Sequence, residues 1–264
     1  MKKIQGEGNN YIDKTIFSGL KLGMNSAKVF WEQKITLSDV SWEHDPQYRF
    51  NFSSKVLRLS KLHWKELSRQ YSALYDGRIL VLQNISESSG VLTLTTSWIE
   101  FSLLAYHNRN ELSIPGTHGV LGCKVLITNP KETHFLAGVR SQKSEHKPGF
   151  LMLPGGLFEI SDINGTLQEA CLRELREELE IQVQEDLMDL IAIIRGEKGN
   201  AAILMIHTKC GILGDGEAPD VSIPVAGNEE WQDNILRWIP LEQIPYLDST
   251  NLMEGLKYLK SRNS

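Results

Sequence analysis

The segment from Thr166 to Ile181 constrains the fold of this chain most, because its residues specify one amphipathic helix. Thr166 and Glu169 have the S/T-x-x-E spacing of a capping box, which fixes where a helix begins. Apolar residues then recur at every fourth position, on a stripe that can face a core. This stripe consists of Leu167, Cys171, Leu175 and Leu179.

The same segment carries a cluster of acidic side chains. Glu174, Glu177 and Glu178 stand at i, i+3 and i+4, so at about 3.6 residues per turn they share one face of the helix. Three carboxylates this close repel one another, and repulsion raises their pKa values unless a cation lies among them. Carboxylate oxygens suit hard ions such as Mg²⁺ or Mn²⁺ better than zinc. The cluster is therefore either a metal site or a solvated acidic surface, and the second is commoner for such a pattern alone.

Two further features favour the metal site. The sequence Leu153-Pro154-Gly155-Gly156 precedes the helix, and a double glycine lets the backbone approach a ligand closely and offer a carbonyl oxygen. Arg173 directly precedes Glu174 and can orient a carboxylate through a forked pair of hydrogen bonds. The glycines, the cap and the arginine all suit the same chemistry, which a solvated helix would not need.

Length, charge and cysteine content narrow the class of protein. The 264 residues are enough for one large domain or two modest ones. A net charge of -5 argues against nucleic acid as a partner, and an anionic substrate would need a local arginine, lysine or metal ion. No run approaches the roughly 20 apolar residues of a membrane helix, and residues 1–13 do not have the pattern of a secretory signal. Cys123, Cys171 and Cys210 are typical of reduced thiols in a cytoplasmic protein.

Hydrophobic patterning divides the chain in two, at a polar segment with a Pro-Gly pair over 108–118. Residues 1–115 are predicted to form a smaller α+β region, with 28–33 as a helix end or a strand. Its predicted strands cover 48–52, 55–59, 78–82 and 91–96, with a polar turn at 84–90 and helices over 62–74 and 98–104, the latter capped by Ser97.

Residues 116–264 are predicted to form the second unit. Strands on both sides of the acidic helix indicate a layered α/β domain. A long loop over 211–230 is of the kind that is often functional. The predicted strands cover 120–127, 134–140, 150–153, 187–194, 201–207 and 235–240, and a helix covers 251–260.

The acidic helix and the glycines before it resemble the Nudix box, G-x5-E-x7-R-E-U-x-E-E-x-G-U, where U is a bulky apolar residue. Gly156 matches the leading glycine. The loop 157–165 is about three residues longer than the motif, Gly165 stands where the motif has its first glutamate, and Glu180 replaces the closing glycine. Glu159 or Asp162 could supply the missing carboxylate. The second half of the motif is matched by Arg173, Glu174, Leu175, Glu177, Glu178 and Ile181.

The resemblance extends over roughly residues 119–247 and includes the strand at Trp238-Ile239-Pro240-Leu241. It implies a Nudix-type α/β/α sandwich with a mixed sheet, preceded by a smaller α+β domain. The implied reaction is metal-dependent hydrolysis of a nucleoside diphosphate linked to a further group. Residues 92–101 and 140–156 also resemble the Nudix-type UDP-glucose pyrophosphatases of animals, which implies cleavage of UDP-glucose or UDP-galactose to UMP and sugar 1-phosphate.

The resemblance also assigns roles to individual residues. Glu174, Glu177 and Glu178 would hold Mg²⁺, or Mn²⁺, with the carbonyl of Gly156, and either Glu178 or Glu174 could be the general base. Arg173 would orient the carboxylates. Glu230, beside Glu229 in the long loop, would complete the metal set or act as the base. Contacts with the substrate phosphates are expected from Arg140, at the end of a strand, and from Gly155 and Gly156, with Lys143, Lys147 and Arg195 as weaker candidates.

Two other functions stay open on these residues. One is a Nudix hydrolase for a different substrate, such as ADP-ribose or a dinucleotide. The other is a nucleotide-binding module that has lost catalysis, for which the missing first glutamate and closing glycine are the support. In each case the expected partner is a small molecule rather than nucleic acid or a membrane, and the sequence does not indicate an oligomeric state.

Overall fold

The computed structural model describes residues 29–48, 50–70, 75–142, 149, 151–179, 188–196, 200–210, 223–224 and 231–241, with the backbone alone at 178, 223–224 and 232–235. The helices are α1 (Ser54–Gln70), α2 (Phe101–Arg109) and α3 (Leu167–Glu178), and η2 (Leu37–Asp39) and η3 (Ile160–Asn164) are short 3-10 turns. The strands are β1 (Val29–Thr36), β2 (Val40–His44), β3 (Arg78–Ser88), β4 (Val91–Glu100), β5 (Gly119–Thr128), β6 (His134–Arg140), β7 (Leu151–Met152), β8 (Asp189–Arg195), β9 (Ala201–Lys209), β10 (Ile223–Pro224) and β11 (Trp231–Pro240).

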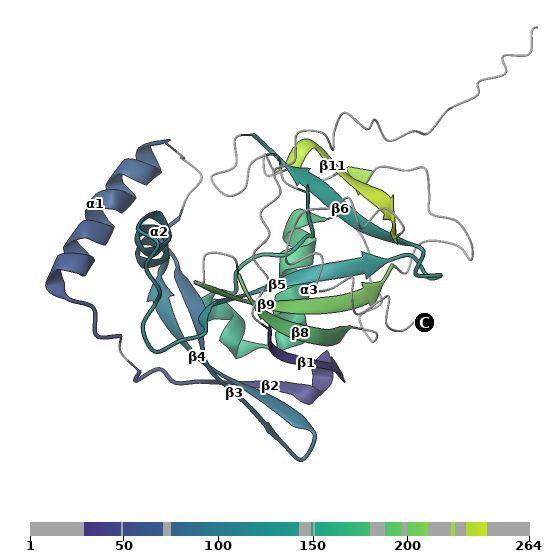
Figure 1. Ribbon diagram of the computed structural model, residues 1–264, viewed down its shortest axis with the longest axis horizontal. Coiled ribbons are helices and arrows are strands. Elements are labelled where there is room, and N and C mark those ends of the chain that lie inside the picture. The colour runs from purple at the N-terminus through teal and green to yellow at the C-terminus, as the bar shows by residue number, and fades with distance from the viewer. Residues whose placement is uncertain are drawn as a thin grey trace, which may run out of the picture.

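In the part of the chain that the structure describes, all eleven strands belong to one sheet. Figure 1 shows β5, β9, β8 and β1 side by side in this sheet. Its main order is β1-β8-β9-β5-β3-β4-β2, and β6 joins β5 to β7 and β11. The pairs β5–β9 and β2–β4 are parallel, whereas neighbours such as β8–β9 and β3–β4 are antiparallel. The predicted α/β class with a mixed sheet is therefore confirmed.

Helix α3 covers one face of the sheet. Its apolar stripe packs against Leu121, Cys123 and Val125 of β5, all fully buried. A second cluster lies against α2, where Ile79 and Val81 of β3 meet Leu103 and Leu104. Helix α1 packs on α2 at the outside of the molecule (Figure 1). Within the described residues, no helix combines the length and the apolar character needed to span a membrane.

The segment 154–159, called the glycine segment below, lies between β3 and β5. These two strands pair directly only at Val81–Val120 and Leu82–Gly119. Beyond that point the glycine segment runs along β5, with Val125 N donating to Pro154 O at 2.9 Å and Phe158 N donating to Leu121 O at 3.0 Å. On its other side, Leu80 N of β3 donates to Phe158 O at 2.8 Å. Strands from both predicted units thus hold this segment, and the division at residue 115 stays a prediction.

The predicted strands in the second unit are confirmed by β5, β6, β7, β8, β9 and β11. In the first unit β3 and β4 are confirmed, and residues 29–33 lie in β1. The strand predicted at 55–59 is wrong, because these residues belong to α1. The strand predicted at 48–52 is wrong as well, because its described residues, 48 and 50–52, lie in no strand. In α1, Val56 packs against the α2 cluster, and Leu67 is buried further along the same helix. The interval between them is about three helical turns, so both side chains lie on one face of α1.

Two boundaries in the first unit also differ from the prediction. Ser97 does not cap a helix, since it pairs with Val81 within β4, and α2 begins only after Glu100. The turn predicted over 84–90 is reduced to Ser89 and Gly90, both with positive φ, because β3 continues to Ser88. The helix predicted over 251–260 and nearly all of the long loop 211–230 lie outside the described residues.

Candidate active site

The capping box predicted at the start of α3 is present. Glu169 N donates to Thr166 Oγ1 at 3.1 Å, and Thr166 N donates to Glu169 Oε2 at 2.6 Å. These hydrogen bonds with Thr166 lower the pKa of the Glu169 carboxyl. The apolar stripe is confirmed as well, since all four of its side chains are buried. Cap and stripe together fix which side of the helix carries the acidic residues.

Replacing Thr166 by alanine is expected to destabilise the protein by about 1 kcal/mol, because the N–H of Glu169 loses its acceptor. Urea unfolding would measure the change. Ser161→Ala is the matched control, since this exposed hydroxyl lies one short turn away and outside the cap. Equal stability of the two variants would contradict the prediction.

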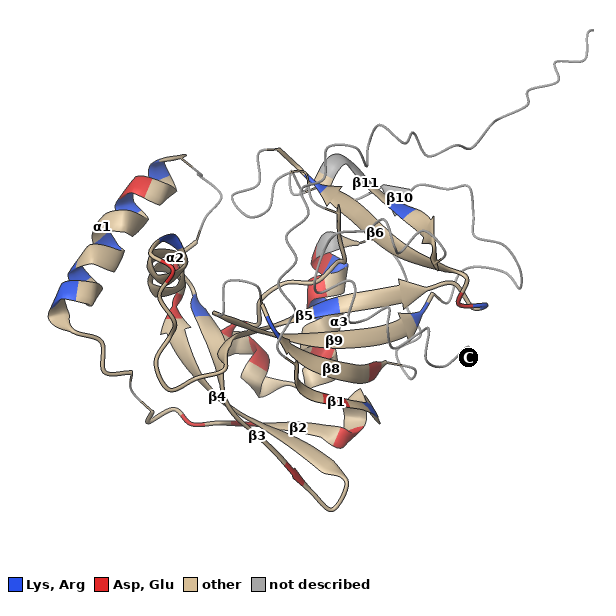
Figure 2. Cartoon of the chain, in the orientation of Figure 1, with Lys and Arg blue, Asp and Glu red and all other residues tan. Residues whose placement is uncertain are grey.

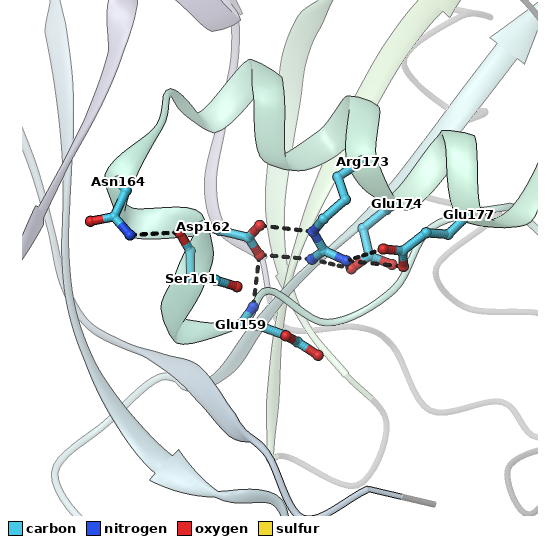
Figure 3. Close-up of polar contacts among 7 residues, drawn as sticks. All are labelled: Glu159, Ser161, Asp162, Asn164, Arg173, Glu174 and Glu177. Carbon is cyan, nitrogen blue, oxygen red and sulfur yellow. Dashed lines mark hydrogen bonds and ion pairs between the residues drawn. The ribbon is translucent and has the colours of Figure 1, made fainter. Parts of the chain in front are cut away.

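Arg173 is the centre of a network of three carboxylates (Figure 3). Its Nε and Nη2 donate to the two oxygens of Asp162 at 2.8 and 2.7 Å. Nη2 also donates to Glu174 Oε1 at 2.6 Å, and Nη1 donates to Glu177 Oε2 at 3.0 Å. The hydrogen bonds to Asp162 raise the pKa of Arg173 further, so the guanidinium remains charged at any working pH. The orienting role predicted for Arg173 matches this geometry.

Of the two acidic residues predicted as replacements for the missing carboxylate, Glu159 and Asp162, it is Asp162 that pairs with Arg173. It lies in η3, within the loop that is longer than the motif, and its side chain is only 6% exposed. Glu159 is exposed, and its N–H donates to Asp162 Oδ2 at 2.8 Å, which turns the aspartate toward the helix (Figure 3). The additional loop residues therefore form a turn that delivers a carboxylate to Arg173 from outside the helix.

Glu174 faces the second glycine of the pair. Its side chain is 9% exposed, and a Cβ built on Gly156 would lie 2.2 Å from Glu174 Oε2. Any residue with a Cβ at position 156 would displace the Glu174 carboxylate from this position. The carbonyl of Gly156 accepts a hydrogen bond from Cys123 N at 2.9 Å and keeps a second lone pair.

The neighbouring Gly155 fixes the course of the backbone here. Its φ is +117°, and a Cβ there would lie 2.6 Å from Cys123 O. Lys124 Nζ donates a hydrogen bond to Gly155 O, which places a cation beside the glycine segment. Lys124 was not predicted as a site residue, because in the sequence it is one polar position within an otherwise apolar strand.

The candidate metal ligands around Gly156 suit a hard divalent cation, because Glu174 and Glu177 offer carboxylate oxygens and Gly156 offers its carbonyl oxygen. Glu174 is buried beside Gly156, whereas the side chain of Glu177 is 60% exposed and pairs with Arg173. Among the described side chains, which do not include that of Glu178, no three histidine, cysteine or acidic side chains cluster closely enough to hold a metal ion. Figure 2 shows acidic and basic residues side by side on α3, among strands that are mostly uncharged.

The remaining predicted site residues are less closely connected to this network. Arg140 ends β6, is buried, and places its guanidinium carbon 5.4 Å from the centre of the Trp231 ring. Arg195 ends β8, with its guanidinium 5.8 Å from the Phe30 ring. Glu229, Glu230, Lys143 and Lys147 lie outside the described residues, so their predicted roles stay predictions.

Replacing Gly156 by alanine is expected to lower kcat at least about tenfold with little loss of stability. The new Cβ would displace the Glu174 carboxylate but would not strain the backbone, because the φ of Gly156 is not positive. Gly155→Ala is the contrasting variant, and it should lower the melting temperature, since both φ and the Cys123 carbonyl oppose a Cβ there. Full activity of Gly156→Ala would show that the carboxylate can move without effect.

A model of the NUDIX domain matches residues 120–258, just over half of the chain. No curated protein matches the sequence.

Solved structures with similar folds include the MutT protein from Methanosarcina mazei Go1, with 21% identity over 55% of this chain and 94% of that one, and a TM-score of 0.36. A C. elegans Ap4A hydrolase has 16% identity over 53% and 95%, with a TM-score of 0.37. The NUDIX domain of Shewanella oneidensis NrtR, complexed with ADP ribose, has 15% identity over 55% and 89%, with a TM-score of 0.40.

Proposed function

Because the chain belongs to the NUDIX family, we propose that it is a metal-dependent hydrolase that cleaves the pyrophosphate of a nucleotide sugar. The proposed substrates are UDP-glucose and UDP-galactose, with UMP and a sugar 1-phosphate as products. The choice of sugar nucleotide is supported by the resemblance of residues 92–101 and 140–156 to Nudix-type UDP-glucose pyrophosphatases. The choice of reaction is supported by the acidic network of α3.

One observation carries the proposal: Arg173 holds Asp162 and Glu174 at once, and Glu174 Oε2 faces Gly156. A solvated acidic helix would not need its glutamate buried, oriented by an arginine, and matched to a glycine that leaves room for it. Asp162 also bears on the alternative of an inactive binding module. That alternative rested partly on the missing first glutamate, and Asp162 supplies a carboxylate to Arg173 in its place.

In the proposed mechanism Glu174, Glu177, Glu178 and the Gly156 carbonyl would hold Mg²⁺ or Mn²⁺, and the bound ion would neutralise charge on the phosphoryl oxygens. Water attacks one phosphorus of the pyrophosphate, and a carboxylate accepts its proton. The bond from that phosphorus to the bridging oxygen breaks, and the phosphate on the other side leaves. Either Glu178 or Glu174 fills that role. Arg173 keeps the carboxylates in place before the substrate arrives, so little reorganisation is needed during the reaction. Arg140, Lys147 and the glycine segment are the proposed contacts for phosphates, and Glu230 is the proposed additional ligand or base.

The proposal is tested by incubating the purified protein with Mg²⁺ and UDP-glucose, UDP-galactose, ADP-ribose or a dinucleoside polyphosphate. Release of phosphate after phosphatase treatment reports cleavage. We expect the highest kcat/KM with a UDP-hexose, and loss of turnover when EDTA removes the metal. A clear preference for ADP-ribose or the dinucleotide would overturn the substrate assignment, and no turnover with any of them would overturn the hydrolase.

A further inference from the structure

The long loop 157–165 is held at both ends by one side chain from the first part of the chain. Trp42, on β2, donates from its indole Nε1 to Gly165 O at 3.0 Å. Its ring also meets the ring of Phe158 edge to face, with centroids 5.8 Å apart and an interplanar angle of 89°. Phe158 is fully buried, so Trp42 touches the fixed beginning of the loop and its last residue.

Gly165 connects this contact to the acidic network. Its N–H donates to Asp162 O at 3.0 Å, which closes the η3 turn, and Thr166 directly after it caps α3. The carbonyl that Trp42 holds therefore lies between the turn that carries Asp162 and the helix that carries Arg173. A shift of this peptide would change the distance between the two partners of the ion pair.

We propose that Trp42 is a positioning residue for the metal site, holding loop 157–165 so that Asp162 meets Arg173. The inference rests on the proposed function, in which Arg173 orients the metal-binding carboxylates. It gives the region before residue 115 a direct part in that site. The loop has more residues than the Nudix motif requires, so it needs an additional contact to adopt one conformation.

Trp31 is a matched control for Trp42. Both tryptophans are partly buried against the same hydrophobic core and come from the same region of the chain. The Nε1 of Trp31 donates to Glu87 Oε2 at 3.3 Å, on β3 rather than on loop 157–165. Losing either indole removes similar packing and one hydrogen bond, but only Trp42 contacts the loop ends.

The experiment compares Trp42→Leu and Trp42→Phe with Trp31→Leu and Trp31→Phe in the full chain. Affinity for Mn²⁺, measured by the electron paramagnetic resonance of free Mn²⁺, gives a readout that does not depend on turnover. We expect Trp42→Leu to weaken Mn²⁺ binding about tenfold and to lower kcat about 10- to 100-fold, with KM little changed. Trp42→Phe keeps a ring beside Phe158 and should lose less, and both Trp31 variants should stay within about twofold of the parent.

A double-mutant cycle with Asp162→Asn separates positioning from general packing. If Trp42 acts through Asp162, adding Trp42→Leu to Asp162→Asn should weaken Mn²⁺ binding far less than it does in the parent. Additive effects, or equal losses from Trp42→Leu and Trp31→Leu, would overturn the inference. Mn²⁺ binding is measured directly, so the two proposals can fail separately. A protein whose Mn²⁺ affinity depends on Trp42 but that cleaves no nucleotide would refute the proposed reaction and leave the positioning role intact.

Discussion

Replacing Glu174 by glutamine is expected to lower kcat about 1000-fold, equivalent to about 4 kcal/mol of transition-state stabilisation. The amide has the size of the carboxylate and can still accept a hydrogen bond from Arg173, so the protein should remain folded. It lacks the negative charge that a hard divalent cation requires of this ligand. Steady-state kinetics at saturating Mg²⁺, together with a melting curve, would measure both quantities.

Glu169→Gln is the control for that experiment, because it makes the same chemical change at the other end of the same helix. Glutamine also serves in a capping box, and Glu169 belongs to the cap rather than to the Arg173 network. Its kcat should stay within about twofold of the parent. If Glu174→Gln kept more than a tenth of the parent activity, the assignment of Glu174 as a metal ligand would be wrong.

Asp162→Asn is expected to lower kcat about 100-fold and the free energy of unfolding by about 2 kcal/mol. The asparagine N–H₂ would face the Nη2 of Arg173, so two donors would meet where a donor and a carboxylate now pair. A fully buried pair would lose more, but the Arg173 side chain is 29% exposed and water would partly replace the lost contact. Kinetics and urea unfolding would measure the two losses.

Asp76→Ala provides the comparison for stability without activity, because alanine, unlike asparagine, leaves no side-chain acceptor. Asp76 accepts a hydrogen bond from Ser102 N at 2.8 Å at the start of α2, so its loss should affect folding and leave kcat unchanged.

Asp162→Glu adds a geometric test, because it keeps the charge and lengthens the side chain. We expect it to recover stability more than kcat. Parent-like kcat in Asp162→Asn would show that Arg173 orients Glu174 without the aspartate.

The centre of the site was predictable from sequence because its interactions are local. The cap, the apolar stripe and the proximity of Arg173 to Glu174 and Glu177 follow from helical spacing, which depends on neighbouring residues alone. The part played by Asp162 depends on how a loop of nine residues turns back, and no periodicity describes that path. Lys124 was missed for a similar reason, since its partner is a backbone carbonyl 31 residues away.

The errors in the first part of the chain have one cause. Residues 55–59 have apolar side chains at 56, 57 and 59, a pattern too short to distinguish a strand from one turn of a helix, and packing against α2 decides between them. Ser97 and Glu100 have the spacing of a capping box, but pairing of β4 with β3 continues through both residues. In each case a contact distant in sequence outweighed a correct local preference.

The position of the glycine segment between β3 and β5 has a consequence for how the molecule folds. The contacts that enclose it join residues far apart in the chain, such as Leu80 with Phe158 and, 123 residues apart, Trp42 with Gly165. Long loops must close before such contacts form, which slows folding. We therefore expect α3 to form early during refolding and the capacity to bind metal to return in a later, slower phase, after β2 and β3 have joined the sheet.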